Sequence, residues 1–221
     1  MFLAQEAFAN PQVYRDLILK SIVVPASKEA YDGKSFICVS FTRFCPVGCS
    51  FCFFSSPPSK KGKTFADAMT EEGIEKFISF ANDANLGYLL VSGGGEPFLE
   101  LNHLLKVVER VNSDKIVLVT SGNWATSPNS ASCIAARIYE AFKKRTRPTQ
   151  LVIRLSVDLE HAKGSLGLKP AYHLISLFEE KYLEEENFKL QFHTLFSDPC
   201  VDQILKNLSS KVLSITDAKC Q

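Results

Sequence analysis

The sequence lacks the long apolar runs that mark membrane proteins and secreted precursors. No stretch approaches the roughly 18 consecutive apolar residues of a membrane-spanning helix. The first residues, Met1–Glu6, have neither the basic start nor the extended apolar segment of a secretory signal. We therefore expect a cytoplasmic protein that does not associate with a membrane.

An excess of charge of one sign is also missing. The 25 Lys and Arg residues nearly balance the 24 Asp and Glu residues, which leaves a formal net charge of +1. Because a strong basic excess is typical of nucleic-acid-binding chains, we expect no nucleic acid partner. Gly and Pro are few, at 11 and 10 residues, and 46% of the residues are hydrophobic, so the composition is that of a folded domain.

The seven cysteines do not form the even-numbered, evenly spread set of a disulfide framework. Three of them, Cys45, Cys49 and Cys52, lie within eight residues. Three thiolates can hold three irons of a cubic cluster and leave the fourth iron open, whereas a structural zinc ion usually has four protein ligands. Cys38 and Cys133 lie in apolar patterns, and we expect both to be small buried side chains.

Apolar runs of strand length alternate along the chain with segments of helical periodicity. The expected strands are Phe36–Phe41, Tyr88–Val91, Ile116–Val119, Leu151–Leu155, Phe188–Phe196 and Lys211–Ile215. Helical spacing of apolar residues is found in Ile74–Ala81, Leu101–Val111, Ile134–Phe142, Leu174–Phe178 and Val201–Leu208. Thr70 is the expected N-cap of the first helix. Short connections between these elements predict an α/β fold, a partial (β/α)6 barrel of parallel strands with outer helices.

Polar or glycine-rich segments directly follow the expected strands. They are the cysteine segment, Gly93–Glu96, Ser121–Asn123 and Ser156–Asp158. Because parallel strands end at one edge of a sheet, we expect these segments to share the edge where such folds build their sites. Residues 1–35 are expected to form an N-terminal preface and residues 36–221 the core domain. The chain ends shortly after the sixth expected strand, as a domain truncated at its C-terminus would.

The pattern Cys45-x3-Cys49-x2-Cys52, with an aromatic residue before the last cysteine, resembles that of the radical S-adenosylmethionine (SAM) enzymes. Gly94, Gly95 and Glu96, after the second expected strand, are similar to that family's motif for the methionine amino group of SAM. The resemblance implies a 4Fe-4S cluster on the three cysteines and SAM bound at its open iron. One-electron cleavage of SAM would then give a 5′-deoxyadenosyl radical that abstracts hydrogen from a substrate.

Further cofactor contacts are implied by the same resemblance. In this family the third and fourth strands often supply polar groups to SAM, and the corresponding candidates are Ser121, Asn123, Arg154 and Ser156. Strand alternation leaves open whether Arg154 faces the cofactor or solvent. No catalytic side chain is assigned, because the radical forms on the cofactor. Asp158 fits a helix cap or turn at least as well as a substrate contact.

The four histidines form no paired metal-ligand spacing, and core or surface positions explain them. The leading hypothesis is a radical SAM enzyme that acts on a peptide or small metabolite and takes electrons from a donor such as flavodoxin or ferredoxin. Two alternatives stay open: a noncatalytic protein of the same fold that binds the cluster and SAM, and a zinc-binding interaction module.

Overall fold

The protein is described from a computed structural model, in which residues 34–57, 68–164 and 166–194 are the described part of the chain. These residues all belong to one compact unit, Lys34–Ser210. The expected helix at Val201–Leu208 and the expected strand at Lys211–Ile215 lie outside the described residues, as does almost all of the expected preface. Within the described residues no helix is long and apolar enough to cross a membrane.

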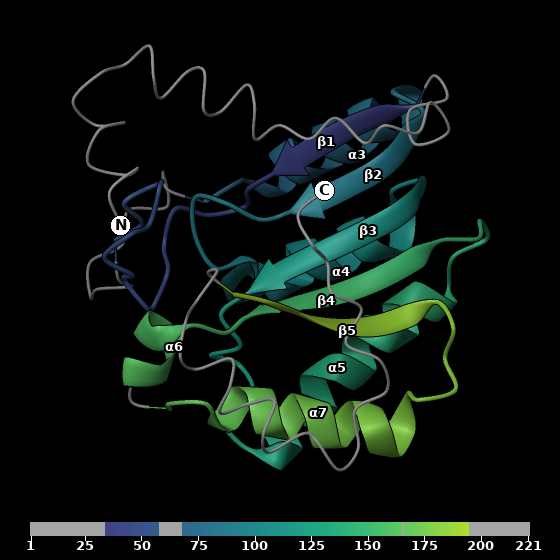
Figure 1. The fold of residues 1–221 in the computed structure, drawn as a ribbon. Helices are drawn as coiled ribbons and strands as arrows, with labels where there is room; N and C mark the ends of the chain where they lie inside the picture. Colours follow the sequence, from purple (N-terminus) through teal and green to yellow (C-terminus); the bar gives the residue numbers. More distant parts are fainter. Residues whose placement is uncertain (1–33, 58–67, 165, 195–221) are drawn as a thin grey trace, which may run out of the picture. The chain divides into compact units, whose positions relative to one another are not determined.

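The described part contains a five-stranded parallel sheet (Figure 1). Its strands are β1 (Ser35–Val39), β2 (Leu86–Val91), β3 (Ser113–Thr120), β4 (Gln150–Ser156) and β5 (Phe188–His193). Their order in the sheet is the same as their order in the chain, and every neighbouring pair is parallel. The predicted α/β fold is therefore confirmed, and five strands in this order are consistent with a partial barrel.

Helices connect the successive strands. They are α3 (Glu71–Asp83), the 3-10 turn η3 (Pro97–Glu100) with α4 (Leu101–Arg110), α5 (Pro128–Lys143), and α6 (Leu159–Lys163) with α7 (Lys169–Lys181). Side-chain caps fix where several of them begin. Thr70 accepts a hydrogen bond from the backbone N–H of Gly73, as the sequence predicts, and Ser127 forms a capping box with Ser130.

One face of the sheet packs against these helices to form the main core. Ile116 and Leu118 of β3 belong to it, together with Ile153 of β4 and residues of α3, α4, α5 and α7. Because side chains alternate along a strand, Val117 and Arg154 lie on the opposite face. Arg154 there lies 3.4 Å from the Tyr88 hydroxyl and 3.2 Å from the Gln191 side-chain oxygen.

The prediction that Cys38 and Cys133 are buried is wrong, because both are exposed. Cys38 lies between Ile37 and Val39, which pack toward the core, so its own side chain faces the other side of β1. Cys133 lies on the outer side of α5. An apolar pattern identifies the element correctly but assigns a small residue in it to the wrong face.

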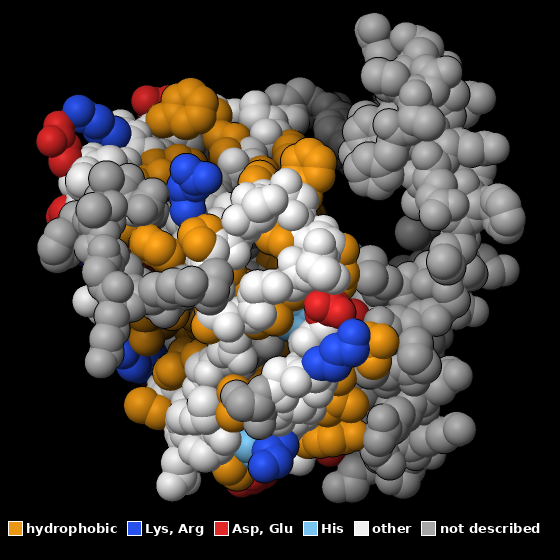
Figure 2. All heavy atoms as spheres, turned by 90° about the vertical axis from the view of Figure 1, so that its left-hand side faces the viewer, with side chains coloured by type: hydrophobic (Ala, Val, Ile, Leu, Met, Phe, Trp, Pro, Cys, Tyr) orange, Lys and Arg blue, Asp and Glu red, His pale blue; other side chains and the backbone are white. Residues whose placement is uncertain are grey.

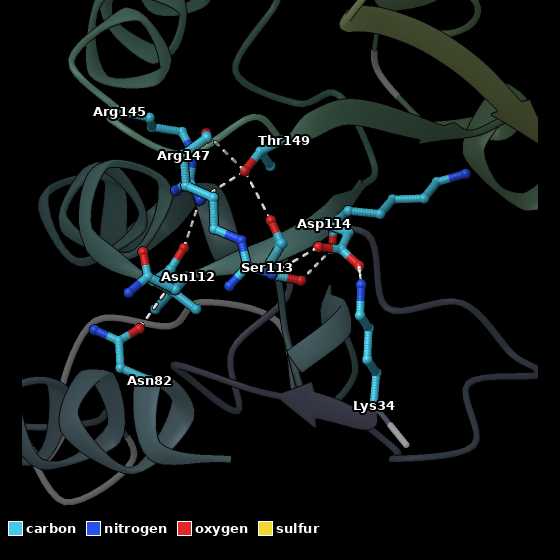
Figure 3. A network of polar contacts seen from close by, with 10 residues as sticks. Lys34, Asn82, Asn112, Ser113, Asp114, Arg145, Arg147 and Thr149 are labelled. Carbon is cyan, nitrogen blue, oxygen red and sulfur yellow. Dashed lines mark hydrogen bonds and ion pairs between the residues drawn. The ribbon is translucent and has the colours of Figure 1, made fainter. Parts of the chain in front are cut away.

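A polar network closes the edge of the sheet where the strands begin (Figure 3). Asp114 accepts hydrogen bonds from Lys34 and, at 2.9 Å, from Arg147. The Arg145 guanidinium donates to the Thr149 hydroxyl at 2.8 Å and to the backbone carbonyls of residues 108 and 111 at the end of α4. Burial lowers the pKa of Arg145 to about 10. These contacts join the end of α4 and the start of β3 to the segment before β4, away from the expected site.

Candidate cluster and cofactor site

The three clustered cysteines lie in the loop that follows β1, at the edge where the strands end. The backbone N–H of Cys45 donates to the Pro57 carbonyl at 3.0 Å, and that of Cys52 donates to the Cys49 carbonyl at 3.1 Å. Gly48 has a φ of 66°, which lets the chain turn between the cysteines. The loop thus brings three partly buried thiols together.

The thiols differ in their ease of ionisation. Burial raises the pKa of Cys49 to about 12, and the negative charges of Asp158, Cys45 and Cys52 add to the effect. Burial also raises the pKa of Cys45, against the opposing backbone hydrogen bonds. For Cys52, burial alone would raise the pKa, but hydrogen bonds from the Ser56 backbone and hydroxyl lower it. Without a metal, Cys49 is a protonated thiol, so iron binding there releases a proton.

The donor set fits an iron–sulfur cluster with one open iron. Thiolates are the protein ligands of such clusters, and each one binds a different iron atom. A backbone hydrogen bond of 3.1 Å joins Cys52 to Cys49, and Cys45 lies four residues before Cys49 in the same loop. No three Cys, His, Asp or Glu side chains within residues 34–57, 68–164 and 166–194 surround a single metal-ion position. The three cysteines therefore lie in one loop but do not surround a single ion.

The glycine segment after β2 packs directly against the cysteine loop. The Ser56 hydroxyl donates to the Gly94 carbonyl at 2.6 Å, and the backbone N–H of Glu96 donates to the Phe44 carbonyl at 2.7 Å. Gly94 has a φ of 60°, which favours glycine. A Cβ at Gly95 would collide with the carbonyl oxygens of Thr42 and, at 2.5 Å, of Phe44. Close backbone contact is therefore the local reason for glycine here.

The Glu96 carboxylate is only 3% exposed and is surrounded by hydrogen-bond donors. One oxygen accepts from the Phe98 backbone N–H at 3.1 Å and from the Thr120 hydroxyl at 2.8 Å. The other accepts from the backbone N–H and the hydroxyl of Ser121, at 2.7 and 2.6 Å. Two predicted cofactor residues, Glu96 and Ser121, therefore contact each other and join the ends of β2 and β3.

Three further predicted cofactor residues, Asn123, Arg154 and Ser156, come from β4 and from the loop after β3. Ser156 ends β4 and pairs in register with His193 of β5. Arg154 lies two residues earlier on the same strand, beside Tyr88 and Gln191. Asn123 is half-buried in the loop after β3. All of them follow or end strands at the expected edge, except Arg154, which lies within the sheet.

The sequence did not reveal that α6 contacts the cysteine loop. His161 Nε2 lies 3.9 Å from the Cys49 sulfur, and His161 Nδ1 lies 2.8 Å from an Asp158 carboxylate oxygen. Glu160 accepts a hydrogen bond from the Ser50 backbone N–H at 3.3 Å. In Figure 1, α6 lies beside this loop at the arrowhead end of the strands. In the sequence, the spacing from Asp158 to His161 at the start of a helix predicts only that Asp158 caps the helix. It does not predict the contact with the cysteine loop.

The edge that carries these groups has few charges. Figure 2 looks onto it and shows mainly hydrophobic and uncharged polar side chains among the described residues. In the cysteine loop, Phe51, Phe53 and Phe54 are 47%, 82% and 53% exposed. The cysteine loop thus presents aromatic rings at the surface around the thiols.

Comparison with known families decides between the alternatives for this site. A family model described as the radical SAM superfamily matches residues 39–171, well over half of the chain. The chain belongs to the radical SAM superfamily. This match covers the cysteine loop, the glycine segment and α6. The radical SAM family implies a 4Fe-4S cluster and SAM, and an enzyme rather than a zinc-binding interaction module.

Curated relatives of this radical SAM domain carry one name, probable dual-specificity RNA methyltransferase RlmN. That of Staphylococcus haemolyticus is 24% identical over 169 residues, 73% of this chain and 44% of the relative. That of Clostridium acetobutylicum is 23% identical over 167 residues, which are 73% of this chain and 46% of the relative. That of Endomicrobium trichonymphae is 33% identical over 86 residues, which are 38% of this chain and 23% of the relative. The chain thus spans less than half the length of these relatives. No solved structure matches it.

These relatives correct one prediction made from the sequence. The expectation of no nucleic acid partner is wrong, because the relatives of this radical SAM chain are named for methylation of RNA. The expectation was based on the formal net charge of +1, which is summed over the whole chain. A sum of charges does not describe one face or pocket, where a few side chains determine binding.

Proposed function

We propose that this chain is the radical SAM domain of an enzyme that methylates RNA. The observation that carries the proposal is the match to relatives named as RNA methyltransferases. The match to the radical SAM family includes the cysteine and glycine motifs. RNA thereby replaces the peptide or small metabolite expected from the sequence. The domain division, with a preface at residues 1–35 and a core at 36–221, and a cytoplasmic location belong to the same proposal.

In this proposal Cys45, Cys49 and Cys52 hold the 4Fe-4S cluster, and SAM occupies the adjoining edge of the sheet. When bound, the cluster and SAM supply one-electron chemistry that the protein's own side chains lack. The cysteine loop provides the thiolates and leaves one iron without a protein ligand. Support comes from the three neighbouring thiols and from the family match over them.

The SAM-binding residues in this proposal are Gly94, Gly95, Glu96, Ser121, Asn123, Arg154 and Ser156. Their contributions differ. The backbone of the glycine segment offers polar groups to SAM, while the buried Glu96 carboxylate acts indirectly by fixing that segment to Ser121. Arg154 provides a cation on the sheet face away from the helices, suited to a carboxylate or a phosphate.

The exposed phenylalanines of the cysteine loop also suit an RNA substrate. Phe51, Phe53 and Phe54 flank or follow the last cluster cysteine, and more than two fifths of each is exposed. Proteins that recognise single-stranded or extruded RNA bases commonly stack them on aromatic side chains. Aromatic rings beside the thiols would thus hold a base close to where the cofactor reacts.

The test is methyl transfer from SAM to RNA by anaerobically reconstituted protein. We expect iron and sulfide to be incorporated in equal amounts, and dithionite with methyl-labelled SAM to place label in unmodified transcribed RNA. Cys49→Ala should abolish both cluster and transfer, because one iron loses its ligand. Cys133→Ala removes an exposed cysteine on α5 and is the matched control, which should behave like the unaltered protein.

The outcomes separate the parts of this proposal. A full cluster in Cys49→Ala would refute the ligand assignment. Formation of 5′-deoxyadenosine without label in RNA would keep the radical chemistry and refute the RNA substrate. Cluster and SAM binding without any SAM cleavage would favour the noncatalytic alternative.

A further inference from the structure

A histidine and an aspartate of α6 form a nearly buried pair behind Cys49. His161 Nε2 lies 3.9 Å from the Cys49 sulfur, and its Nδ1 lies 2.8 Å from Asp158 Oδ2. The two side chains are only 13% and 6% exposed. A polar pair this far from solvent is held in one arrangement, unlike an exposed ion pair, which exchanges freely with water.

Asp158 fixes the ring of His161 through two separate contacts. Its Oδ1 accepts the backbone N–H of His161 at 3.0 Å, which caps α6, while Oδ2 contacts the ring nitrogen. Burial alone would raise the pKa of Asp158, but the hydrogen bonds from the His161 side chain and backbone lower it. The carboxylate therefore holds the ring so that Nε2 is directed toward the Cys49 sulfur.

A second link joins α6 to the same loop. Glu160 Oε2 accepts the Ser50 backbone N–H at 3.3 Å, one residue after Cys49. The contacts of Glu160 and His161 bridge 110 and 112 residues of sequence. Both are made by one short helix, which is attached to the end of β4 through the Asp158 cap. The cysteine loop is therefore held by α6 as well as by the glycine segment.

We propose that His161, oriented by Asp158, is a positioning residue for the cluster ligand Cys49. The inference rests on the proposed function, since it requires Cys49 to bind iron. Residues that contact a metal ligand from behind fix the ligand's direction, and their loss typically lowers metal affinity about 10- to 100-fold. In this proposal the iron ligands are the three cysteines, and His161 acts through its contact with Cys49.

The experiment uses the reconstituted full chain and follows the cluster, not the reaction. We expect His161→Ala to release iron to a chelator about 10- to 100-fold faster than the unaltered protein. Asp158→Asn should do the same to a smaller extent, because the amide still accepts the cap hydrogen bond but no longer orients the ring. Lys76→Gln, at an exposed position of α3, is the control. Circular dichroism of each variant establishes that the fold is retained.

Pulsed electron paramagnetic resonance of the reduced cluster gives a second readout, independent of stability. In protein labelled with ¹⁵N-histidine and free of SAM, we expect a weak nitrogen coupling that is absent in His161→Ala. Release rates equal to the control, with no histidine coupling, would overturn the inference while the ligand assignment survives. A strong coupling typical of direct iron ligation would also overturn it. Cluster retention by Cys49→Ala would instead refute the proposed function.

Discussion

Glu96 lies where the loop after β2 meets the end of β3. Its two oxygens accept four hydrogen bonds, from Phe98, Thr120 and twice from Ser121, and the side chain is almost completely buried. A buried carboxylate is tolerated only when its lone pairs are satisfied in this way. The residue's contribution is therefore the connection between two strand ends, and in our proposal it supports the cofactor through the geometry of the glycine segment.

Replacing Glu96 by Ala should destabilise the fold. The change leaves the Thr120 and Ser121 donors without their acceptor, and each buried unsatisfied group costs about 1–3 kcal/mol. We expect the free energy of unfolding in urea, followed by circular dichroism, to fall by about 3 kcal/mol. Glu186→Ala, at an exposed position before β5, should change it by less than about 0.5 kcal/mol. Unchanged stability with weaker SAM binding would show that the carboxylate contacts the cofactor directly.

The cysteine loop gains its shape from the elements around it. Gly95 approaches the carbonyls of Thr42 and Phe44, Ser56 binds Gly94, and α6 contacts Cys49 and Ser50. The backbone of the loop itself is tied by only a few internal hydrogen bonds. Neighbouring segments, rather than local sequence, therefore position the thiols for a cluster.

The change Gly95→Ala tests this dependence. The added Cβ meets backbone oxygens that cannot move aside without shifting the cysteine loop. We expect the sheet to fold, as judged by far-ultraviolet circular dichroism, but reconstitution to incorporate several-fold less iron. Glu186→Ala, at an exposed position before β5, is again the control and should incorporate iron as the unaltered protein does. Normal iron content in Gly95→Ala would show that the loop adapts.

The sequence predicted the elements better than the contacts between them. Alternating apolar runs identified all five described strands, and Thr70 identified the start of α3, because both depend on neighbours in the chain. The expected strand from Phe36 to Phe41 ends earlier, at Val39, where the chain turns into the cysteine loop. The contact between His161 and Cys49 spans 112 residues and leaves no local pattern, so an isolated histidine gave no sign of it.

The two edges of the sheet carry different groups of side chains. The edge where strands end carries the thiols and the glycine segment, and the opposite edge carries ion pairs (Figure 3). Asp114 there links Lys34, 80 residues away, with Arg147, 33 residues away. The ion pairs of Asp114 thus lie at the edge of the sheet away from the proposed cofactor site.

Asp114 gives a pH dependence of known sign. The hydrogen bond from Lys34, together with Arg147, lowers the pKa of Asp114 below its ordinary value of 3.8. A carboxylate whose pKa falls on folding stabilises the fold above the unfolded-state pKa, and this contribution is lost as pH falls through the folded pKa. Since all three side chains are partly exposed, we expect Asp114→Asn to cost only about 0.5 kcal/mol at pH 7.

The measurement is urea unfolding of both proteins between pH 7 and pH 2. The difference in unfolding free energy should close as pH falls below about 4, because both proteins then carry a neutral group at this position. Glu186→Gln, at an exposed position before β5, is the control and should stay within about 0.5 kcal/mol of the unaltered protein. A gap for Asp114→Asn that persists at pH 2 would attribute the effect to packing and not to charge.

The strand order, identical to the chain order, has a consequence for how the protein would acquire the proposed cluster. During synthesis each new strand can join the one before it, so the sheet grows as the chain leaves the ribosome. The thiols emerge early, whereas Asp158 and His161 follow more than 100 residues later. A nascent chain therefore exposes Cys45, Cys49 and Cys52 before their supports exist, and iron delivery during translation would meet an unfinished binding loop until α6 is made.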